Sequence, residues 1–305
     1  MDFIGYDRVN DRVWVPAGNT GTIQIVDGGT GALNVLGGFP TAPSQRAGRP
    51  SRGPSSVAIA AGTVWVGNRG DNSLLAFDPS TLKQVGAIRL AAMPDALTYV
   101  SGRKELWATT PETSSITVVS VAAKKPGIVA EIKVPGSPEC FAVDNQGGRI
   151  YTNLEDKDQT VGIDARTRKV VSSWPSACGS LGPRGLALDE QRRVLFVACT
   201  DGVGVFDLAH DGKSTDRLKT GAGVDGLDYD AARRRLFVAS AKDGALTVAR
   251  LTDAGKLTVE AKVPTHAGAR NPVSDKRGRI YLPVSEAAEL IVIDPEALVQ
   301  THQAH

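Results

Sequence analysis

RIYTN at residues 149–153, followed by TVGID at residues 160–164, decides the fold, because this pair of short apolar segments recurs along the chain. An aromatic residue with apolar neighbours stands at seven positions: Trp14, Trp65, Trp107, Tyr151, Phe196, Phe237 and Tyr281. Their successive spacings are 51, 42, 44, 45, 41 and 44 residues. The second segment ends 13 residues after the aromatic in six repeats and 11 residues after it in the fifth. Such a period indicates a repeat architecture.

Each repeat also carries an apolar segment before the aromatic one, such as CFAVD at residues 140–144, and most carry a fourth segment. Four short β-rich segments separated by Gly, Pro, Asn and Asp turns are typical of a four-stranded antiparallel blade. A solenoid of the same period would need capping repeats at its ends, and none is visible in the sequence. We therefore predict an all-β fold, a seven-bladed β-propeller of four-stranded antiparallel blades, in a single domain over residues 1–305.

The predicted blades span approximately residues 2–39, 54–90, 93–134, 137–176, 182–220, 223–264 and 268–302. We expect FIGYD, residues 3–7, to form the inner strand of the first blade. Residues 297–302 are the sole candidate for the outer strand of the last blade. Either this segment completes the seventh blade, or an N-terminal piece that has been trimmed away supplied a strand or a secretion signal.

Composition narrows the classes of partner. The chain has 35 Lys+Arg and 33 Asp+Glu, a formal net charge of +2, and no long basic run, so we expect no nucleic-acid partner. No apolar run approaches the roughly 20 residues of a membrane-spanning helix, and the first residues do not resemble a signal peptide, so we expect no membrane partner. We expect a monomer.

Three cysteines, Cys140, Cys178 and Cys199, form no CxxC pair, so the sequence supports neither a zinc knuckle nor a disulfide scaffold. A bridge between Cys178 and Cys199 is an alternative that we rank below two small buried hydrophobic residues.

Blade topology places the candidate site on one face. The connections between blades and those between second and third strands share the face on which propellers usually carry their function. Aligning the inner strands puts one residue of each blade at the mouth of the central channel: Asp2, Ser55, Asp95, Glu139, Arg184, Asp225 and either Arg270 or Asn271. Carboxylates about 6 Å apart repel each other by roughly 1–3 kcal/mol per pair at effective dielectric constants of about 20–50. A bound cation, protonation of one acid or the charge of Arg184 alone must offset this repulsion.

We favour a divalent metal ion, with Ca²⁺ first, because a hard cation accepts oxygen ligands from several blades. The predicted ligands are Asp95, Glu139 and Asp225, with the amide oxygens of Asn68 and Asn153 at the ends of second strands. The alternative is a hydrated channel whose acids bind no ligand.

His266 lies on the connection between the sixth and seventh blades and is the best placed of the 4 histidines to act as a general base. The alternative for a single loop histidine is a plain surface residue. Arg184 would hold an oxyanion or orient the substrate, Glu139 would act in catalysis, and Asn271 would bind substrate.

The stretch at residues 40–54 is longer than its counterparts and carries Arg46, Arg49 and Arg52. It is either a lid whose arginines, Arg49 among them, bind an anionic or polar substrate, or a surface loop.

Two other motifs lie in surroundings that do not support a functional role. Gly221, Gly223 and Gly226 match GxGxxG, but no helix follows to receive a pyrophosphate. Arg233, Arg234 and Arg235 fall in a hairpin turn on the opposite face, where we expect a solvated charge cluster.

RIYTN at residues 149–153 and TVGIDARTRKVVSSW at residues 160–174 resemble the YVTN-type β-propeller repeat, whose relatives include the lactonase-like seven-bladed propellers. The resemblance covers essentially the whole chain and implies a periplasmic or secreted location. It is specific for the fold and weak for function, since this architecture hosts lactonases, lyases and binding modules.

These residues support two classes of function. The first is a metal-assisted hydrolase of lactones or activated esters, including phosphotriesters, that acts on a small-molecule substrate at the channel mouth. The second is a binding or scaffold propeller without catalytic activity. A lyase acting on a cyclic ester would use a similar metal and base.

Overall fold

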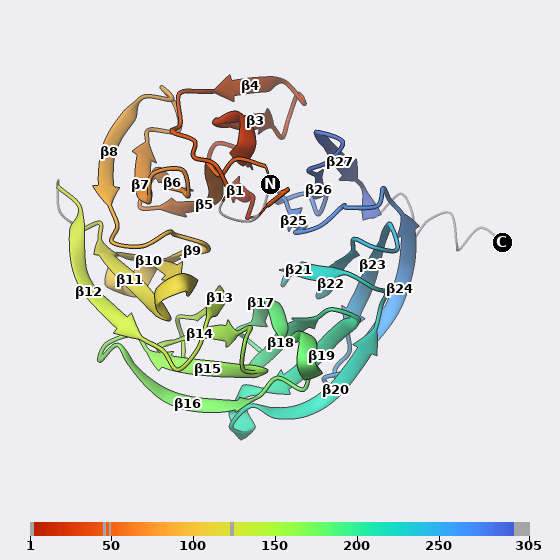
Figure 1. Cartoon of the computed structure of the whole chain (residues 1–305). Helices are drawn as coiled ribbons and strands as arrows, with labels where there is room; N and C mark the ends of the chain where they lie inside the picture. The colour runs from red at the N-terminus through yellow and green to blue at the C-terminus, as the bar shows by residue number, and fades with distance from the viewer. Residues whose placement is uncertain (1–2, 45–46, 49, 123–124, 296–305) are drawn as a thin grey trace. The chain divides into compact units, whose positions relative to one another are not determined.

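The computed structural model describes residues 3–44, 47–48, 50–122 and 125–295, and these residues fold into short antiparallel strands (Figure 1). Within them, six sheets of four strands and one sheet of three strands follow one another along the chain. None of the helices in the described ranges is long and apolar enough to cross a membrane. The predicted fold class is confirmed: the chain is all-β, a seven-bladed β-propeller.

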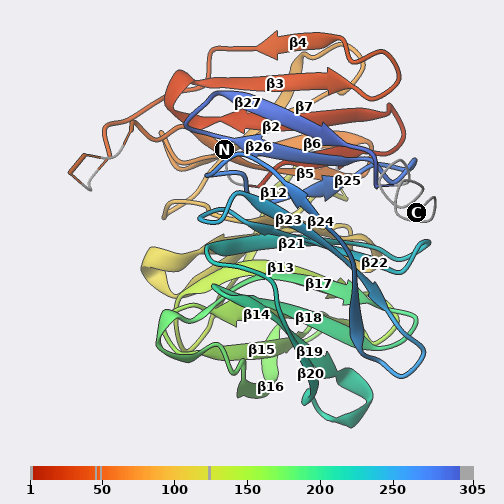
Figure 2. The same ribbon diagram turned by 90° about the vertical axis from the view of Figure 1, so that its right-hand side faces the viewer.

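Each sheet takes its strands in sequence order, as Figure 2 shows for the fifth. The first three blades are β1 (Gly5–Asp7), β2 (Arg12–Ala17), β3 (Thr22–Asp27) and β4 (Leu33–Leu36); β5 (Pro54–Ala60), β6 (Thr63–Asn68), β7 (Ser73–Phe77) and β8 (Gln84–Arg89); and β9 (Leu97–Val100), β10 (Glu105–Thr110), β11 (Ser115–Ser120) and β12 (Gly127–Lys133). The fourth and fifth blades are β13 (Pro138–Asp144), β14 (Arg149–Leu154), β15 (Gln159–Asp164) and β16 (Lys169–Pro175); and β17 (Pro183–Asp189), β18 (Val194–Cys199), β19 (Gly202–Asp207) and β20 (Lys213–Lys219).

The sixth blade contains β21 (Val224–Asp230), β22 (Arg235–Ser240), β23 (Ala245–Leu251) and β24 (Leu257–Pro264), and the seventh contains β25 (Val273–Ser274), β26 (Ile280–Val284) and β27 (Glu289–Ile293). Residues 297–302, expected as the last outer strand, lie outside the described residues. Five short 3-10 helices lie in the described loops: η1 (Gly18–Thr20), η2 (Ser101–Arg103), η3 (Pro111–Thr113), η4 (Gly179–Leu181) and η5 (Leu208–His210). The chain divides into two compact units: residues 1–150 with 163–170, and residues 151–162 with 171–305.

The aromatic residue that marks each repeat is buried on the second strand of its blade, with an exposed fraction of at most 2%. In the first unit, Trp14 belongs to a cluster with Ile25 of its own blade and Val64 and Val66 of the next blade. A blade has two apolar faces, so this packing against the neighbouring blade buries surface that a single sheet would expose to water. The spacing of the aromatic residues in the sequence therefore corresponds to the length of chain in one blade.

The acid that ends the third strand has a local role in the turn that follows. The Oδ1 atom of Asp164 accepts hydrogen bonds from the backbone N–H groups of Arg166 (3.1 Å) and Thr167 (2.6 Å) and from the Thr167 hydroxyl (2.8 Å). The backbone hydrogen bond from Thr167 is the largest cause that lowers the pKa of Asp164. Asp27 and Asp78 hold their turns in the same way. The recurrent acid of the repeat is thus a turn residue.

Inner strands of neighbouring blades approach closely in the second unit. A Cβ atom on Gly226 would lie 2.3 Å from Oδ1 and 3.0 Å from Cα of Asn271, at the start of the seventh blade. A Cβ atom on Gly185, in the fifth blade, would lie 2.9 Å from Cα of Gly226. Gly226 of the GxGxxG match is therefore a packing residue, and β21 starts two residues before it.

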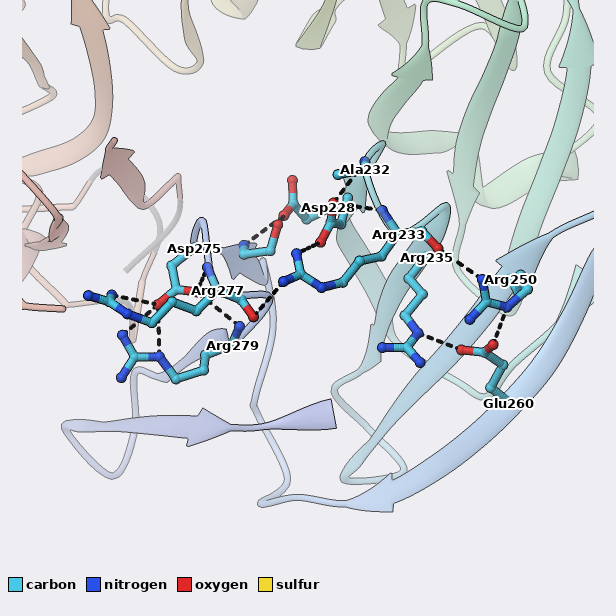
Figure 3. A network of polar contacts seen from close by, with 11 residues as sticks. Asp228, Ala232, Arg233, Arg235, Arg250, Glu260, Asp275, Arg277 and Arg279 are labelled. Carbon is cyan, nitrogen blue, oxygen red and sulfur yellow. Dashed lines mark hydrogen bonds and ion pairs between the residues drawn. The ribbon is translucent and has the colours of Figure 1, made fainter. Parts of the chain in front are cut away.

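The arginines at residues 233–235 are not the solvated charge cluster that we expected, and this prediction was wrong. Arg235 is only 4% exposed, and its Nε donates to Glu260 of the fourth strand at 2.7 Å (Figure 3). Arg233 donates to the backbone carbonyl of Arg277 at 2.9 Å and so joins the sixth blade to the seventh. Glu260 and Arg277 lie 25 and 44 residues along the chain from their donors, so a local reading of the turn does not reveal them.

Cys178 and Cys199 form a disulfide, with a Cα–Cα distance of 5.1 Å, so our preference for two small hydrophobic residues was wrong. The bond ties the loop before β17 to the end of β18. Two cysteines 21 residues apart come within bonding distance only once the blade geometry is known. Cys140 is a buried free cysteine.

We expect the substitution Gly226→Ala to destabilise the protein by about 1–3 kcal/mol, because the new methyl group overlaps the backbone of Asn271. Thermal and denaturant unfolding measure the loss. The matched control is Gly127→Ala, since a Cβ atom there meets nothing within 4 Å. Equal stabilities of the two variants would contradict the close approach of the sixth and seventh inner strands.

We expect Asp164→Asn to lower the melting temperature at neutral pH, because the folded state keeps Asp164 ionised more strongly than the unfolded chain does. Since the folded pKa is lowered, this contribution is present above the unfolded pKa of about 4 and is lost as the pH falls further. The difference from wild type should therefore shrink toward about pH 2, as melts at several pH values can show. Asp211→Asn, in another turn, is the control; a difference independent of pH would oppose this role.

Candidate functional site

In the first unit, Asp95 and Glu139 lie at the start of the inner strands of the third and fourth blades, where the alignment put them. Asp95 forms an ion pair with Arg69, the residue that follows β6. The two side chains are 13% and 23% exposed. The backbone carbonyl of Glu139 accepts a hydrogen bond from the hydroxyl of Thr109 at 3.0 Å. A guanidinium group from the preceding blade thus compensates the charge of Asp95.

The second unit repeats this arrangement. Arg184, at the start of β17, forms an ion pair with Glu155 of the preceding blade and also donates to the carbonyl of Leu181 at 3.2 Å. Asp225, at the start of β21, pairs with Arg270 at 3.4 Å. All four side chains of these two pairs are 24–37% exposed. Each pair therefore joins neighbouring blades and remains within reach of solvent.

These pairs change the charge balance that we expected at the channel mouth. The sequence alignment counted one guanidinium group, Arg184, against four carboxylates. Arg69 and Arg270 each add a positive charge in contact with a predicted metal ligand. An adjacent guanidinium favours the ionised carboxylate without a metal ion. Arg69 was missed because it lies one residue beyond the strand end that the alignment used.

Asn153, a predicted metal ligand, is fully buried and holds the next blade in place. Its Nδ2 donates to the backbone carbonyl of Arg184 at 2.6 Å, and its Oδ1 accepts from the hydroxyl of Thr160 at 2.7 Å. Asn68, also fully buried, donates to the carbonyl of Pro40 at 3.0 Å. Both amides thus satisfy backbone or hydroxyl groups that burial would otherwise leave without a partner.

Thr109 has a structural role at the mouth that the sequence analysis did not predict. It stands two residues after its repeat aromatic, as Asn153 does, and both side chains bind the backbone carbonyl of the mouth residue in the next blade. Among the seven repeats this position is otherwise Pro, Gly or Ala. A polar side chain at an otherwise apolar aligned position was the signal that could have found Thr109.

His266, the predicted general base, is 63% exposed, and its Nδ1 lies 2.7 Å from Oε2 of Glu289. A carboxylate hydrogen-bonded to an imidazole orients the ring, as the carboxylate partner of a general base does. His210 makes the same contact with Asp207, also at 2.7 Å, in a turn to which we assigned no role. The pair is therefore compatible with catalysis and equally with a surface turn.

The remaining predicted positions differ in their surroundings. Asn271 is 7% exposed and has a φ of 54°, so its backbone adopts a left-handed conformation at the start of the seventh blade. Arg52 pairs through its backbone with Ala42, which brings together two parts of the stretch at residues 40–54. Ser55 is buried and donates to the Gly67 carbonyl at 3.4 Å. Asp2, Arg46 and Arg49 lie outside the described residues.

The described side chains fit a metal ion poorly. Among them, no three His, Cys, Asp or Glu residues gather in a way that could hold one. Ca²⁺ at Asp95 and Asp225 would have to displace Arg69 and Arg270 from these carboxylates. The Oδ1 atom of Asn153 already accepts a hydrogen bond. Calcium binding at these residues stays a prediction.

Comparison with known proteins shows the fold. No family model matches the chain, and no curated protein matches its sequence. Similar solved structures include hydrazine synthase of Kuenenia stuttgartiensis, with a TM-score of 0.79, 13% identity, and coverage of 95% of this chain and 94% of that one. Virginiamycin B lyase from Staphylococcus aureus has a TM-score of 0.74, 13% identity, and coverage of 95% and 93%. The Cps50 (Swd1) β-propeller domain of Myceliophteria thermophila has a TM-score of 0.71, 13% identity, and coverage of 96% of both chains.

We expect Asn153→Ala to destabilise the protein by about 1–3 kcal/mol, because it removes the side-chain amide that donates to the carbonyl of Arg184 and accepts from the hydroxyl of Thr160. The loss should be equal with and without a chelator, as thermal melts can test. Asn34→Ala, on the exposed outer strand β4, is the control and should change stability little. A loss that appears only in the absence of chelator would identify Asn153 as a metal ligand instead.

Proposed function

We propose that this chain is a non-catalytic binding propeller whose mouth loops dock a polar partner that carries charges of both signs. One observation carries the proposal: Asp95, Arg184 and Asp225, three of the charged residues predicted at the mouth, form ion pairs across blade junctions. Such pairs hold the loops in place and present both charges to solvent. Charge complementarity of this kind gives a binding surface its specificity.

The buried polar residues beside these pairs support a rigid docking surface. Thr109 and Asn153 each fix the backbone of the next inner strand through a hydrogen bond. A surface whose backbone is already ordered loses little conformational freedom when a partner binds. The resemblance to YVTN-type propellers is consistent with this function and with an enzyme, because the fold alone does not select between them.

A hydrolase of lactones or activated esters is the second candidate, and the contact between His266 and Glu289 favours it. His266 would accept a proton from the water that attacks the carbonyl carbon, while the carboxylate of Glu289 stabilises the imidazolium. Arg184 would stabilise the oxyanion. The predicted Ca²⁺ at Asp95, Glu139 and Asp225 would polarise the carbonyl, but only after the arginine pairs have opened.

A substrate panel separates the two functions. We expect purified protein to hydrolyse lactones, aryl esters and phosphotriesters no faster than background, and His266→Ala to change nothing. The matched control is His210→Ala, which removes an exposed histidine with the same carboxylate contact. Turnover that falls at least tenfold in His266→Ala and persists in His210→Ala would overturn the binding proposal and support the hydrolase.

A thermal melt with and without chelator tests the metal in the same preparations. We expect equal melting temperatures, because guanidinium groups already compensate Asp95 and Asp225. A bound ion at 100 to 1,000 times its dissociation constant would instead add about 3–4 kcal/mol of stability. A fall in melting temperature on chelation that Asp95→Asn and Asp225→Asn abolish would establish the predicted metal site.

A further inference from the structure

The first unit contains a pocket of about 340 Å³ at the opposite ends of the inner strands from Asp95 and Glu139. Val100, the last residue of β9, and Val143, near the end of β13, line it together with Ile150 and Ala165. Five residues along β13 separate this end from Glu139, roughly 17 Å of extended strand. The pocket is therefore separate from the proposed docking loops.

Two arginines, Arg103 and Arg166, line the pocket beside this apolar surface, and both are exposed. The Nη2 atom of Arg103 lies 3.7 Å from Oε1 of Glu105, which is beyond hydrogen-bond distance. Glu105 is already engaged by Arg168 at 2.7 Å. No hydrogen bond joins the guanidinium group of Arg166 to any other side chain in the part of the chain that the structure describes.

Two acids, Asp144 and Asp164, also line the pocket, and both accept hydrogen bonds from backbone N–H groups of their own turns. The charge of Arg166 also acts on Asp164. The Oδ1 atom of Asp164 accepts three hydrogen bonds within its turn. Asp144 is only 1% exposed, and the N–H of Gly147 is among its partners, at 2.7 Å. The three turns that border the pocket, residues 101–105, 144–149 and 164–169, contain six basic and three acidic residues. The local surplus of three positive charges exceeds the +2 of the whole chain.

We propose that this pocket is a binding site for a small organic anion, a phosphate ester or a carboxylate with an apolar body. The anionic group binds Arg103 and Arg166, whose planar guanidinium groups match phosphate and carboxylate geometry. The apolar body lies against Val100, Val143 and Ile150. A pocket with an apolar lining and a few convergent polar groups is the usual form of a small-molecule site.

Gly102 is the lining position at which a side chain can be added. It lines the pocket, and a Cβ atom at this position would meet nothing within 4 Å. A side chain there therefore fills ligand space without overlapping the protein. Gly102→Leu blocks the site sterically, and Arg103→Gln and Arg166→Gln remove its charge, so the two properties can be tested independently.

Isothermal titration of the full chain with phenyl phosphate, benzoate, inorganic phosphate and benzyl alcohol tests the site. We expect phenyl phosphate or benzoate to bind at one site per chain, more tightly than inorganic phosphate, and benzyl alcohol not to bind. The stronger of the two organic anions identifies the preferred anionic group. Arg103→Gln and Arg166→Gln should each weaken that binding about tenfold or more, as the loss of a charge-assisted hydrogen bond does.

The matched control is Arg8→Gln, which removes an exposed arginine from the corresponding turn of the first blade, away from the pocket. It should keep the wild-type affinity within about twofold, since long-range charge effects are small at physiological salt. Gly102→Leu should abolish binding while its thermal melt matches wild type; if it does not fold, Gly102→Ala replaces it and should weaken binding. Absence of binding by both organic anions, equal losses in Arg8→Gln, or unchanged affinity in the Gly102 variant would overturn the proposal.

Discussion

Every other feature of this fold depends on the packing of one blade against the next. A four-stranded blade has two apolar faces, so its second strand can bury a large aromatic residue such as Trp14 only if a neighbouring sheet covers it. The distance between successive aromatic residues in the sequence is the length of chain needed to build one such sheet. Once that length is established, the inner strand of each blade begins at a predictable residue, and so does each loop at the channel mouth.

The strands and the mouth positions followed from the sequence for this reason, whereas the side-chain partners did not. Asp95 and Asp225 lie at the strand starts that the alignment selected, because strand position depends on a repeated apolar pattern. Their partners Arg69 and Arg270 lie in loops, where no repeat constrains the residue type; the alignment did not include Arg69 and offered Arg270 only as an alternative to Asn271. An alignment of strands therefore overestimates the unbalanced charge at a junction between blades, since the loops supply the compensating groups. The disulfide between Cys178 and Cys199 was ranked below the alternative of two buried hydrophobic residues for the same reason.

Asn153 illustrates a second limit of reasoning from residue type. An amide at the end of a strand suits a hard cation, and it also suits a backbone carbonyl that must be buried. The sequence shows the residue type, but it does not show which buried groups around that residue need a hydrogen-bond partner. Here the group is the backbone carbonyl of Arg184 in the next inner strand, which accepts a hydrogen bond from Asn153. Thr109 makes the corresponding hydrogen bond one blade earlier, so both repeats with a polar residue at this position use it for structure.

The two ends of the inner strands in the first unit differ in the partners of their charged side chains. At the mouth end, Asp95 and Arg69 neutralise each other, so a partner must exchange or bridge existing ion pairs. At the opposite end, the carboxylate of Asp164 is engaged by backbone N–H groups, and the guanidinium groups of Arg103 and Arg166 lie beside an apolar pocket. The turns around the pocket contain six basic residues and three acidic residues. One short inner strand therefore connects a charge-compensated mouth to a pocket surrounded by an excess of basic residues.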